Sequence, residues 1–171
     1  MPCPTLESER LILASISLED RDDIFQNFTE DIATYLYPQP PEKIEETEKF
    51  IVRAMAQNAA GTDMQLVIRK KETNEFIGCC GLHDAKTSTP EPGIWLKKNA
   101  HGNHFGREAV TRLKRYADEN LTYDFLRYPV AKENWPSRKI AESLGGIVVK
   151  EFVKPNANGK MMDEVEYHIP R

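Results

Sequence analysis

The sequence has few cysteines, and they follow no pattern that a disulfide framework or a metal site requires. Only three occur among 171 residues, at Cys3, Cys79 and Cys80. Two adjacent cysteines point to opposite faces of a strand, and none of the three has the paired spacing of a zinc site. We therefore expect reduced, buried thiols, and we expect the chain to bind no metal.

A long hydrophobic run and an excess of basic residues are also missing. No apolar stretch approaches the ~20 residues of a membrane-spanning helix, and MPCPTLESERLIL (1–13) does not follow the pattern of a signal peptide. The formal net charge is -4, which argues against nucleic acid as the main partner. We expect a soluble, cytoplasmic protein without nucleic-acid or membrane partners.

What the sequence does contain is an alternation of strand-like and helix-like segments, within a length that fits a single domain (1–171). Their order predicts a mixed α/β domain. Ser17 and Asp20 have the spacing of a variant capping box at the start of the first helix. The predicted strands are 10–17, 64–70, 76–85, 93–98, 125–133, 147–154 and 161–169. One predicted helix ends near Leu36, and three others span 42–58, 105–119 and 137–146.

A glycine-containing turn, NAHGNHFGREAV (99–110), joins the strand at 93–98 to the helix at 105–119. Unpaired N–H groups at a helix start, together with the helix dipole, bind anions. Gly102 and Gly106 permit a phosphate to approach the backbone where a side chain would block it. A plain connecting turn is the alternative interpretation. His101 and His104 could also be metal ligands, but no third ligand follows nearby.

A second segment, VAKENWPSRKIAESLGG (130–146), begins about thirty residues after that turn. It predicts a strand, then Asn134, then a helix that begins around Ser137 and stops at glycine. Taken alone, Asn134 fits a helix cap and Ser137 fits an ordinary first-turn residue.

The order and spacing of four segments resemble the GNAT N-acetyltransferases, and within them the RimJ/RimL-like branch. The resemblance covers nearly the whole chain and implies a mixed, mostly antiparallel sheet of about seven strands flanked by about four helices. It also implies acetyl-CoA as cosubstrate, an amine acceptor that is a small molecule or a peptide N-terminus, and a monomer or homodimer. The four segments are LESERLIL (6–13), EPGIWLKKNAHGNHFGREAV (91–110), ENWPSRKIAESLGG (133–146) and DEVEYHI (163–169).

The same resemblance implies which residues contact acetyl-CoA. The turn departs from the usual pattern, because His101 takes the basic position and His104 replaces the middle glycine, while Gly106 matches. If the middle position requires a positive φ, a histidine there costs about 1 kcal/mol. The expected contacts are Ile94, Trp95, Leu96, His101, Gly102, Asn103, His104, Phe105, Gly106, Arg107, Asn134 and Ser137.

Acetyl transfer to an amine requires a group that meets the departing thiolate and a base that accepts a proton. The resemblance assigns the first role to Ser137, as a hydrogen-bond donor to the thiolate. For the base, Glu91 and His83 remain alternatives, and each could instead be a solvent-exposed side chain. An imidazole suits the role because it titrates near neutral pH.

Two glutamates and two tyrosines are the remaining candidates from the sequence. Glu164 and Glu166, in the last predicted strand, are expected to be surface residues rather than bases. Tyr35 and Tyr37 lie where the architecture would place an acceptor cleft, although Tyr35 fits the core equally well.

A catalytically idle acyl-CoA-binding or sensor domain of the same fold is the alternative function, favoured by the substituted turn. A nucleotide-binding loop is a weaker option, because the turn lacks the Lys-Ser/Thr ending of a P-loop.

Overall fold

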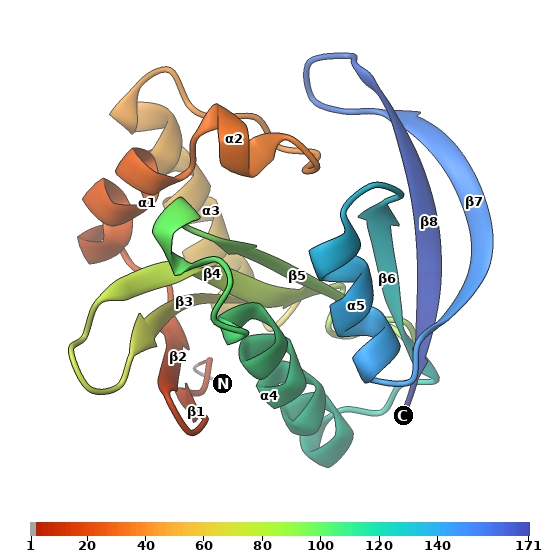
Figure 1. The fold of residues 1–171 in the computed structure, drawn as a ribbon. Helices are drawn as coiled ribbons and strands as arrows, with labels where there is room; N and C mark the ends of the chain where they lie inside the picture. The colour runs from red at the N-terminus through yellow and green to blue at the C-terminus, as the bar shows by residue number, and fades with distance from the viewer. Residues whose placement is uncertain (1–2) are drawn as a thin grey trace.

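Two antiparallel sheets and five α-helices make up residues 3–171, the part of the chain that the computed structural model describes (Figure 1). The first sheet has the order β1-β2-β3-β4-β5, with β1 (Leu6–Glu7), β2 (Leu11–Ser15), β3 (Met64–Lys70), β4 (Phe76–His83) and β5 (Glu91–Leu96). The second has the order β6-β8-β7, with β6 (Phe125–Ala131), β7 (Ile147–Pro155) and β8 (Met161–Pro170). The helices are α1 (Arg21–Asn27), α2 (Glu30–Ala33), α3 (Ile44–Ala60), α4 (Phe105–Asn120) and α5 (Trp135–Ser143), with short 3-10 turns η1 (Leu18–Asp20) and η2 (Lys98–Ala100).

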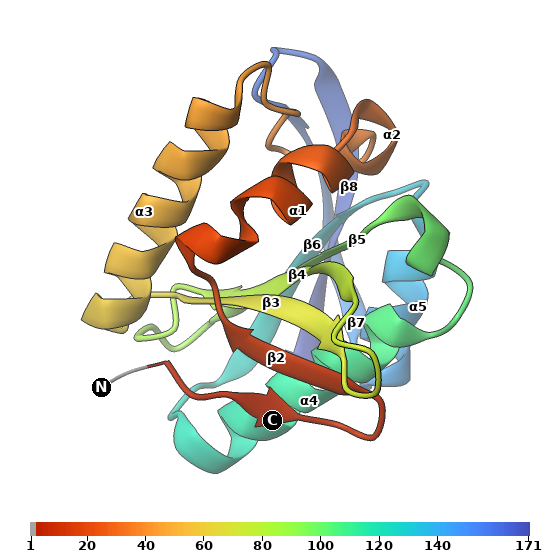
Figure 2. The same cartoon turned by 90° about the vertical axis from the view of Figure 1, so that its left-hand side faces the viewer.

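Helices cover both faces of the first sheet, because its central strands carry apolar residues on both sides. In Figure 2, α1 and α3 lie above the sheet and α4 lies below it. Val67 and Cys79 pack with Ile51 of α3 on the upper side, whereas Leu66 packs with Leu113 of α4 on the lower side. The lower cluster also contains residues of β6 and β8, so it joins the two sheets.

The mixed α/β class predicted from the sequence is confirmed, with three differences in detail. Eight strands form two sheets instead of about seven in one, and β1 (Leu6–Glu7) had no counterpart among the predicted strands. The helix predicted to end near Leu36 is instead split into η1, α1 and α2. The break follows from tertiary packing: α1 ends where Phe28 leaves helical geometry, with its ring 5.1 Å from that of Trp95.

The two sheets meet at β5 and β6, and prolines separate these strands after a short contact. The amide of Arg127 donates to the carbonyl of Pro90 (2.9 Å), and the chain directions there are parallel. In a parallel ladder the next two donors across this edge would be the amides of residues 92 and 129. Both positions are prolines, which have no N–H. No further backbone hydrogen bond joins β5 to β6 anywhere in residues 3–171; we call this region the β5/β6 split.

Within the described residues, no helix is both long enough and apolar enough to cross a bilayer.

The capping box predicted at Ser17 and Asp20 is present and is connected to the first sheet. The Asp20 carboxylate accepts from the amide of Ser17 (2.9 Å) and, through its other oxygen, from Arg69 of β3 (2.8 Å). Asp23 of α1 accepts from the same guanidinium (3.0 Å), but its side chain is 43% exposed, against 10% for Asp20. One buried carboxylate therefore fixes the start of the helical layer on the sheet.

We predict that Asp20→Ala lowers the free energy of unfolding by about 2 kcal/mol or more, because it removes the reciprocal bond of the capping box and the more buried of the two carboxylates that pair with Arg69. Asp23→Ala removes the more exposed partner of the same arginine and should cost less than about 1 kcal/mol. Urea denaturation of the two variants provides the comparison. Equal losses of unfolding free energy would contradict the argument that the buried carboxylate stabilises the fold more than the exposed one.

Candidate active site

The turn before α4 presents a run of free backbone N–H groups. The amide of Glu108 donates to the carbonyl of His104 (3.1 Å), so the amides of residues 105–107 precede the helical hydrogen bonds. Within residues 3–171, the amides of residues 102–104 have no hydrogen-bond acceptor either. Six successive donors at the start of a 16-residue helix form a candidate anion site.

His104 has a left-handed conformation, with φ 60° and ψ 18°, so the middle position of the turn does require a positive φ. Its side chain is exposed, so no buried contact of the ring compensates for this conformation. His101 is fixed differently: its Nε2 donates to the carbonyl of Leu96 (2.9 Å). Among residues 3–171, no group of three His, Cys, Asp or Glu side chains is arranged to hold a metal ion.

Gly106 is buried in the first turn of α4, where its missing side chain serves packing. A Cβ at this position would lie 3.2 Å from Cδ1 of Ile140 in α5 and 3.6 Å from Cδ1 of Leu96 in β5. The start of α4 therefore lies directly against the helix that carries Ser137.

The backbone of β5 borders the β5/β6 split. The amide of Lys97 donates to the carbonyl of Ile77 (2.8 Å), which sets the phase of the β4–β5 ladder. Because bonding alternates in an antiparallel pair, the N–H groups of Ile94 and Leu96 point away from β4, toward the split. The side chain of Trp95 lies on the opposite face of the sheet from the side chains of Ile94 and Leu96, and its ring is 5.1 Å from that of Phe28.

Ser137 is held from two sides at the start of α5. The Asn134 side chain caps the helix by accepting from the Ser137 amide (3.4 Å), as its sequence position predicted. The Ser137 hydroxyl lies 2.7 Å from that of Tyr128, which is buried in β6. Burial raises the pKa of Tyr128 to about 12, so the phenol stays protonated at neutral pH and can donate to Ser137.

Tyr128 was not among the residues predicted from the sequence. Its position in FLRYPVA indicates only an inward-facing strand residue, and an inward tyrosine is ordinarily a core residue. A buried tyrosine hydroxyl does require a hydrogen-bond partner, but the sequence does not identify which one.

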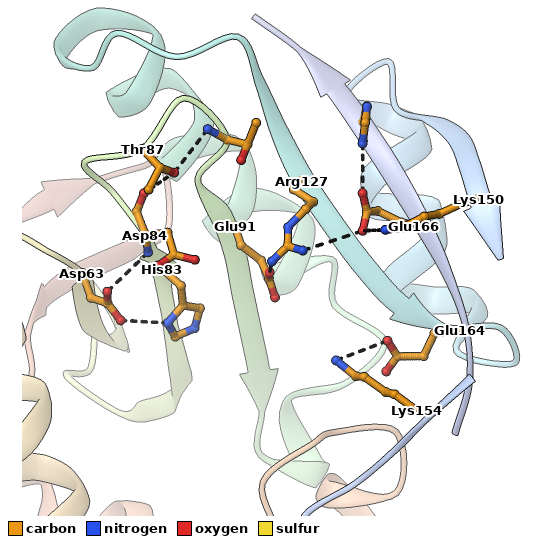
Figure 3. A network of polar contacts seen from close by, with 12 residues as sticks. Asp63, His83, Asp84, Thr87, Glu91, Arg127, Lys150, Lys154, Glu164 and Glu166 are labelled. Atoms are coloured by element: carbon orange, nitrogen blue, oxygen red, sulfur yellow. Dashed lines mark hydrogen bonds and ion pairs between the residues drawn. The ribbon is translucent and has the colours of Figure 1, made fainter. Parts of the chain in front are cut away.

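His83, at the end of β4, is held by Asp63, and Figure 3 shows the two side chains in contact. The distance from Asp63 Oδ2 to His83 Nδ1 is 3.0 Å, which leaves Nε2 as the outward nitrogen. Nε2 lies 3.1 Å from where a Cβ on Gly93 would be, so the imidazole packs closely over the backbone of β5 at this glycine. This carboxylate–imidazole pair has the geometry of an oriented base.

Glu91 is directly opposite His83 in the β4–β5 register, but its carboxylate is engaged elsewhere. Arg127 of β6 donates to it at 2.6 Å (Figure 3). This ion pair joins β5 to β6 just where the split begins.

The prediction that Glu164 and Glu166 are surface residues was wrong: they are 5% and 4% exposed. Both lie on β8, the central strand of the second sheet, so strands flank them on both sides. Glu166 is held by His168 (2.9 Å) and Lys150 (3.4 Å). Burial raises the pKa of Glu164, the nearby charge of Glu91 raises it further, and Lys154 opposes both effects.

Tyr35 and Tyr37 are exposed rather than core residues. The segment after α2 that carries them is tied to the turn between β7 and β8, because the amide of Ala157 donates to the carbonyl of Tyr37 (3.0 Å). Figure 1 shows this segment approaching the β7–β8 turn across the top of the molecule.

Comparison with known proteins gives a consistent set of similarities. Residues 10–147 match a family model described as an acetyltransferase (GNAT) domain. A Bacillus licheniformis protein named uncharacterized N-acetyltransferase p20 is 32% identical over 166 residues, covering 93% of this chain and 92% of that protein.

Solved structures show the same fold at lower identity. RimL, a ribosomal L7/L12 alpha-N-protein acetyltransferase, has a TM-score of 0.86 at 16% identity, covering 98% of this chain and 94% of that one. The spermidine N-acetyltransferase of Vibrio cholerae, in complex with CoA and spermine, has a TM-score of 0.82 at 20% identity, covering 95% and 96%.

We predict that His104→Gly raises the free energy of unfolding by about 0.5 to 1 kcal/mol, because glycine adopts positive φ without the clash of a Cβ. Gly102→Ala is the matched control in the same turn. Gly102 has φ 80°, and a Cβ there would meet nothing within 4 Å, so its expected loss of about 1 kcal/mol comes from the backbone alone. Urea denaturation measures both; destabilisation by His104→Gly would contradict the strain argument.

Proposed function

We propose that this chain, which belongs to the GNAT acetyltransferase family, transfers the acetyl group of acetyl-CoA to a primary amine. The observation that carries the proposal is the run of free amides at residues 102–107, on a helix start packed against the helix of Ser137. The candidate anion site and the helix that carries Ser137 therefore lie next to each other beside the β5/β6 split. The similar spermidine acetyltransferase was solved with CoA bound, which supports the same ligand here.

Acetyl-CoA would supply an activated acetyl group as a thioester, and this chain's backbone would hold its diphosphate. The donors would be the backbone amides of the six residues after His101, which are Gly102, Asn103, His104, Phe105, Gly106 and Arg107. The N–H groups of Ile94 and Leu96, which point to the split, are placed to receive the acetyl oxygen and the pantetheine arm.

Ser137 stabilises the departing thiolate as a hydrogen-bond donor. Either hydroxyl can donate in the contact between Tyr128 and Ser137. In the proposed arrangement the protonated phenol is the donor, which leaves the serine's own proton free to point outward. Tyr128 thus acts as a positioning residue.

His83 is the base of the proposed reaction, oriented by Asp63. It accepts one proton from the acceptor ammonium through Nε2. The amine nitrogen then bonds to the acetyl carbon as the carbon–sulfur bond breaks, and the second ammonium proton neutralises the thiolate. Glu91, the other candidate from the sequence, is paired with Arg127 and maintains the junction of β5 with β6.

The acceptor is a small amine or a peptide N-terminus, and the similar enzymes include one of each kind by name. A direct test measures thiol release from acetyl-CoA with benzylamine, spermidine and a tetrapeptide with a free N-terminus. We expect acetylated product with at least one of them. Binding of acetyl-CoA by calorimetry without turnover on any amine would favour the sensor domain instead.

We predict that Ser137→Ala lowers kcat on the order of 100-fold, because the thiolate loses its hydrogen bond. The Kd of acetyl-CoA, measured by calorimetry, should change by less than about threefold. An unchanged kcat at saturating acetyl-CoA would reject the role of Ser137.

We predict that Tyr128→Phe lowers kcat about fivefold, the equivalent of one hydrogen bond of roughly 1 kcal/mol. If Tyr128 acts through Ser137, adding it to Ser137→Ala should cause no further loss, since the two effects share one contact. Steady-state kinetics of both single variants and the double variant measure this coupling. Additive losses would assign Tyr128 a separate, structural effect.

A further inference from the structure

Glu164 is the one buried carboxylate on β8 that lacks a hydrogen-bond partner. Its Oε2 has no solvent exposure and no hydrogen bond, and the nearest cation, Nζ of Lys154, lies 3.6 Å away. Glu166, two residues along the same strand, has a close partner on His168. A buried, unsatisfied carboxylate oxygen is costly, so a protein that retains one has a reason to do so, and a cationic ligand is one such reason.

Two aromatic rings surround the ammonium that faces Glu164. Nζ of Lys154 lies 5.7 Å from the centre of the Tyr37 ring and 5.8 Å from that of Phe152. Phe152 is the register partner of Glu164 across β7 and β8, and Tyr37 comes from the segment after α2. A carboxylate combined with aromatic faces is the chemistry that binds alkylammonium groups. Here a lysine of the chain itself occupies that position.

This ammonium position borders the region proposed for chemistry. From the contact between Pro90 and Arg127, four residues along each strand lead to Ile94 on β5 and Ala131 on β6. Ala131 is the register partner of Glu164, so Glu164 lies one strand away from the β6 edge of the split. In Figure 3, Glu164 and Lys154 lie on the same side of the second sheet as Glu91 and Arg127.

We propose that Glu164, Tyr37 and Phe152 form the binding site for the ammonium group of the acceptor, and that Lys154 fills it until the acceptor displaces it. This inference rests on the proposed acetyl transfer and narrows its acceptor to a positively charged alkylamine. Lys154 is suited to displacement, because its side chain is 39% exposed and its ion pair with Glu164 is long.

The decisive variants have opposite expected effects. Lys154→Met removes the internal occupant and should lower the KM of a cationic acceptor by about tenfold, whereas Glu164→Gln removes the carboxylate and should raise it by at least about tenfold. In the double variant the gain from Lys154→Met should disappear, because that gain requires the carboxylate.

Lys150→Met is the matched control on the same strand. It removes the same charge beside Glu166, which keeps His168, so the KM should change by less than about twofold. If Lys150→Met and Lys154→Met changed the KM of the cationic acceptor equally, the change would come from the net charge of the protein, and the proposal would be overturned.

A binding measurement without acetyl-CoA separates this inference from the proposed function. Calorimetry with butylammonium should show tighter binding to Lys154→Met than to the wild type and no binding to Glu164→Gln; n-butanol, the neutral analogue, should bind none of them. If butylammonium binds in this pattern while no amine is acetylated, the proposed function fails and the ammonium site stands.

If amines are acetylated but Glu164→Gln leaves both binding and KM unchanged, the ammonium site fails alone. Thermal denaturation checks the fold of each variant. If Lys154→Met is destabilised because the Glu164 carboxylate is left unpaired, butylammonium should raise the Tm of this variant. Glu164→Gln then still tests the site, because glutamine is a neutral side chain of the same shape.

Discussion

The arrangement of this protein depends on the hydrogen bonds that β5 and β6 do not make. Two adjacent parallel strands would ordinarily continue their ladder and close one sheet. Here Pro92 and Pro129 take the two positions that would donate next, so the strands part after the contact between Arg127 and Pro90. A central sheet edge with free N–H groups is costly, because these donors require an acceptor from outside the ladder.

Each element of the candidate site is placed by that separation. The free edge of β5 presents the amides of Ile94 and Leu96, and the helices that follow β5 and β6 bring their starts together through Gly106 and Ile140. One helix start supplies unpaired amides for an anion, and the other supplies Ser137. The ion pair of Glu91 with Arg127 holds the strands at the junction, so the split has a fixed origin.

Several carboxylates lie around the β5/β6 split (Figure 3), and they differ in the groups that they contact. Glu91 is paired with Arg127, Glu166 lies close to His168, and Asp63 holds an imidazole. Glu164 faces an ammonium on a long, partly exposed side chain, without a hydrogen bond. The distribution of partners, more than the number of acids, points to where a positively charged acceptor would bind.

Several features of this protein follow from the sequence by itself, because they depend on residues close together in the chain. The capping box of Ser17 with Asp20, the helix cap at Asn134 and the turn in which His104 replaces a glycine each involve four residues or fewer. The main strands and helices follow from their periodicity for the same reason. The order of the motifs was enough to indicate the family.

Only the tertiary structure decided the rest. The hydrogen bond of Tyr128 to Ser137, the burial of Glu164 and the ring of Tyr37 over Lys154 join residues from different elements. In the sequence, Glu164 lies in an alternating strand whose glutamates look exposed, and its burial arises because β8 became the middle of a sheet. Local patterns determine which element a residue belongs to, but packing between distant elements determines what that residue faces.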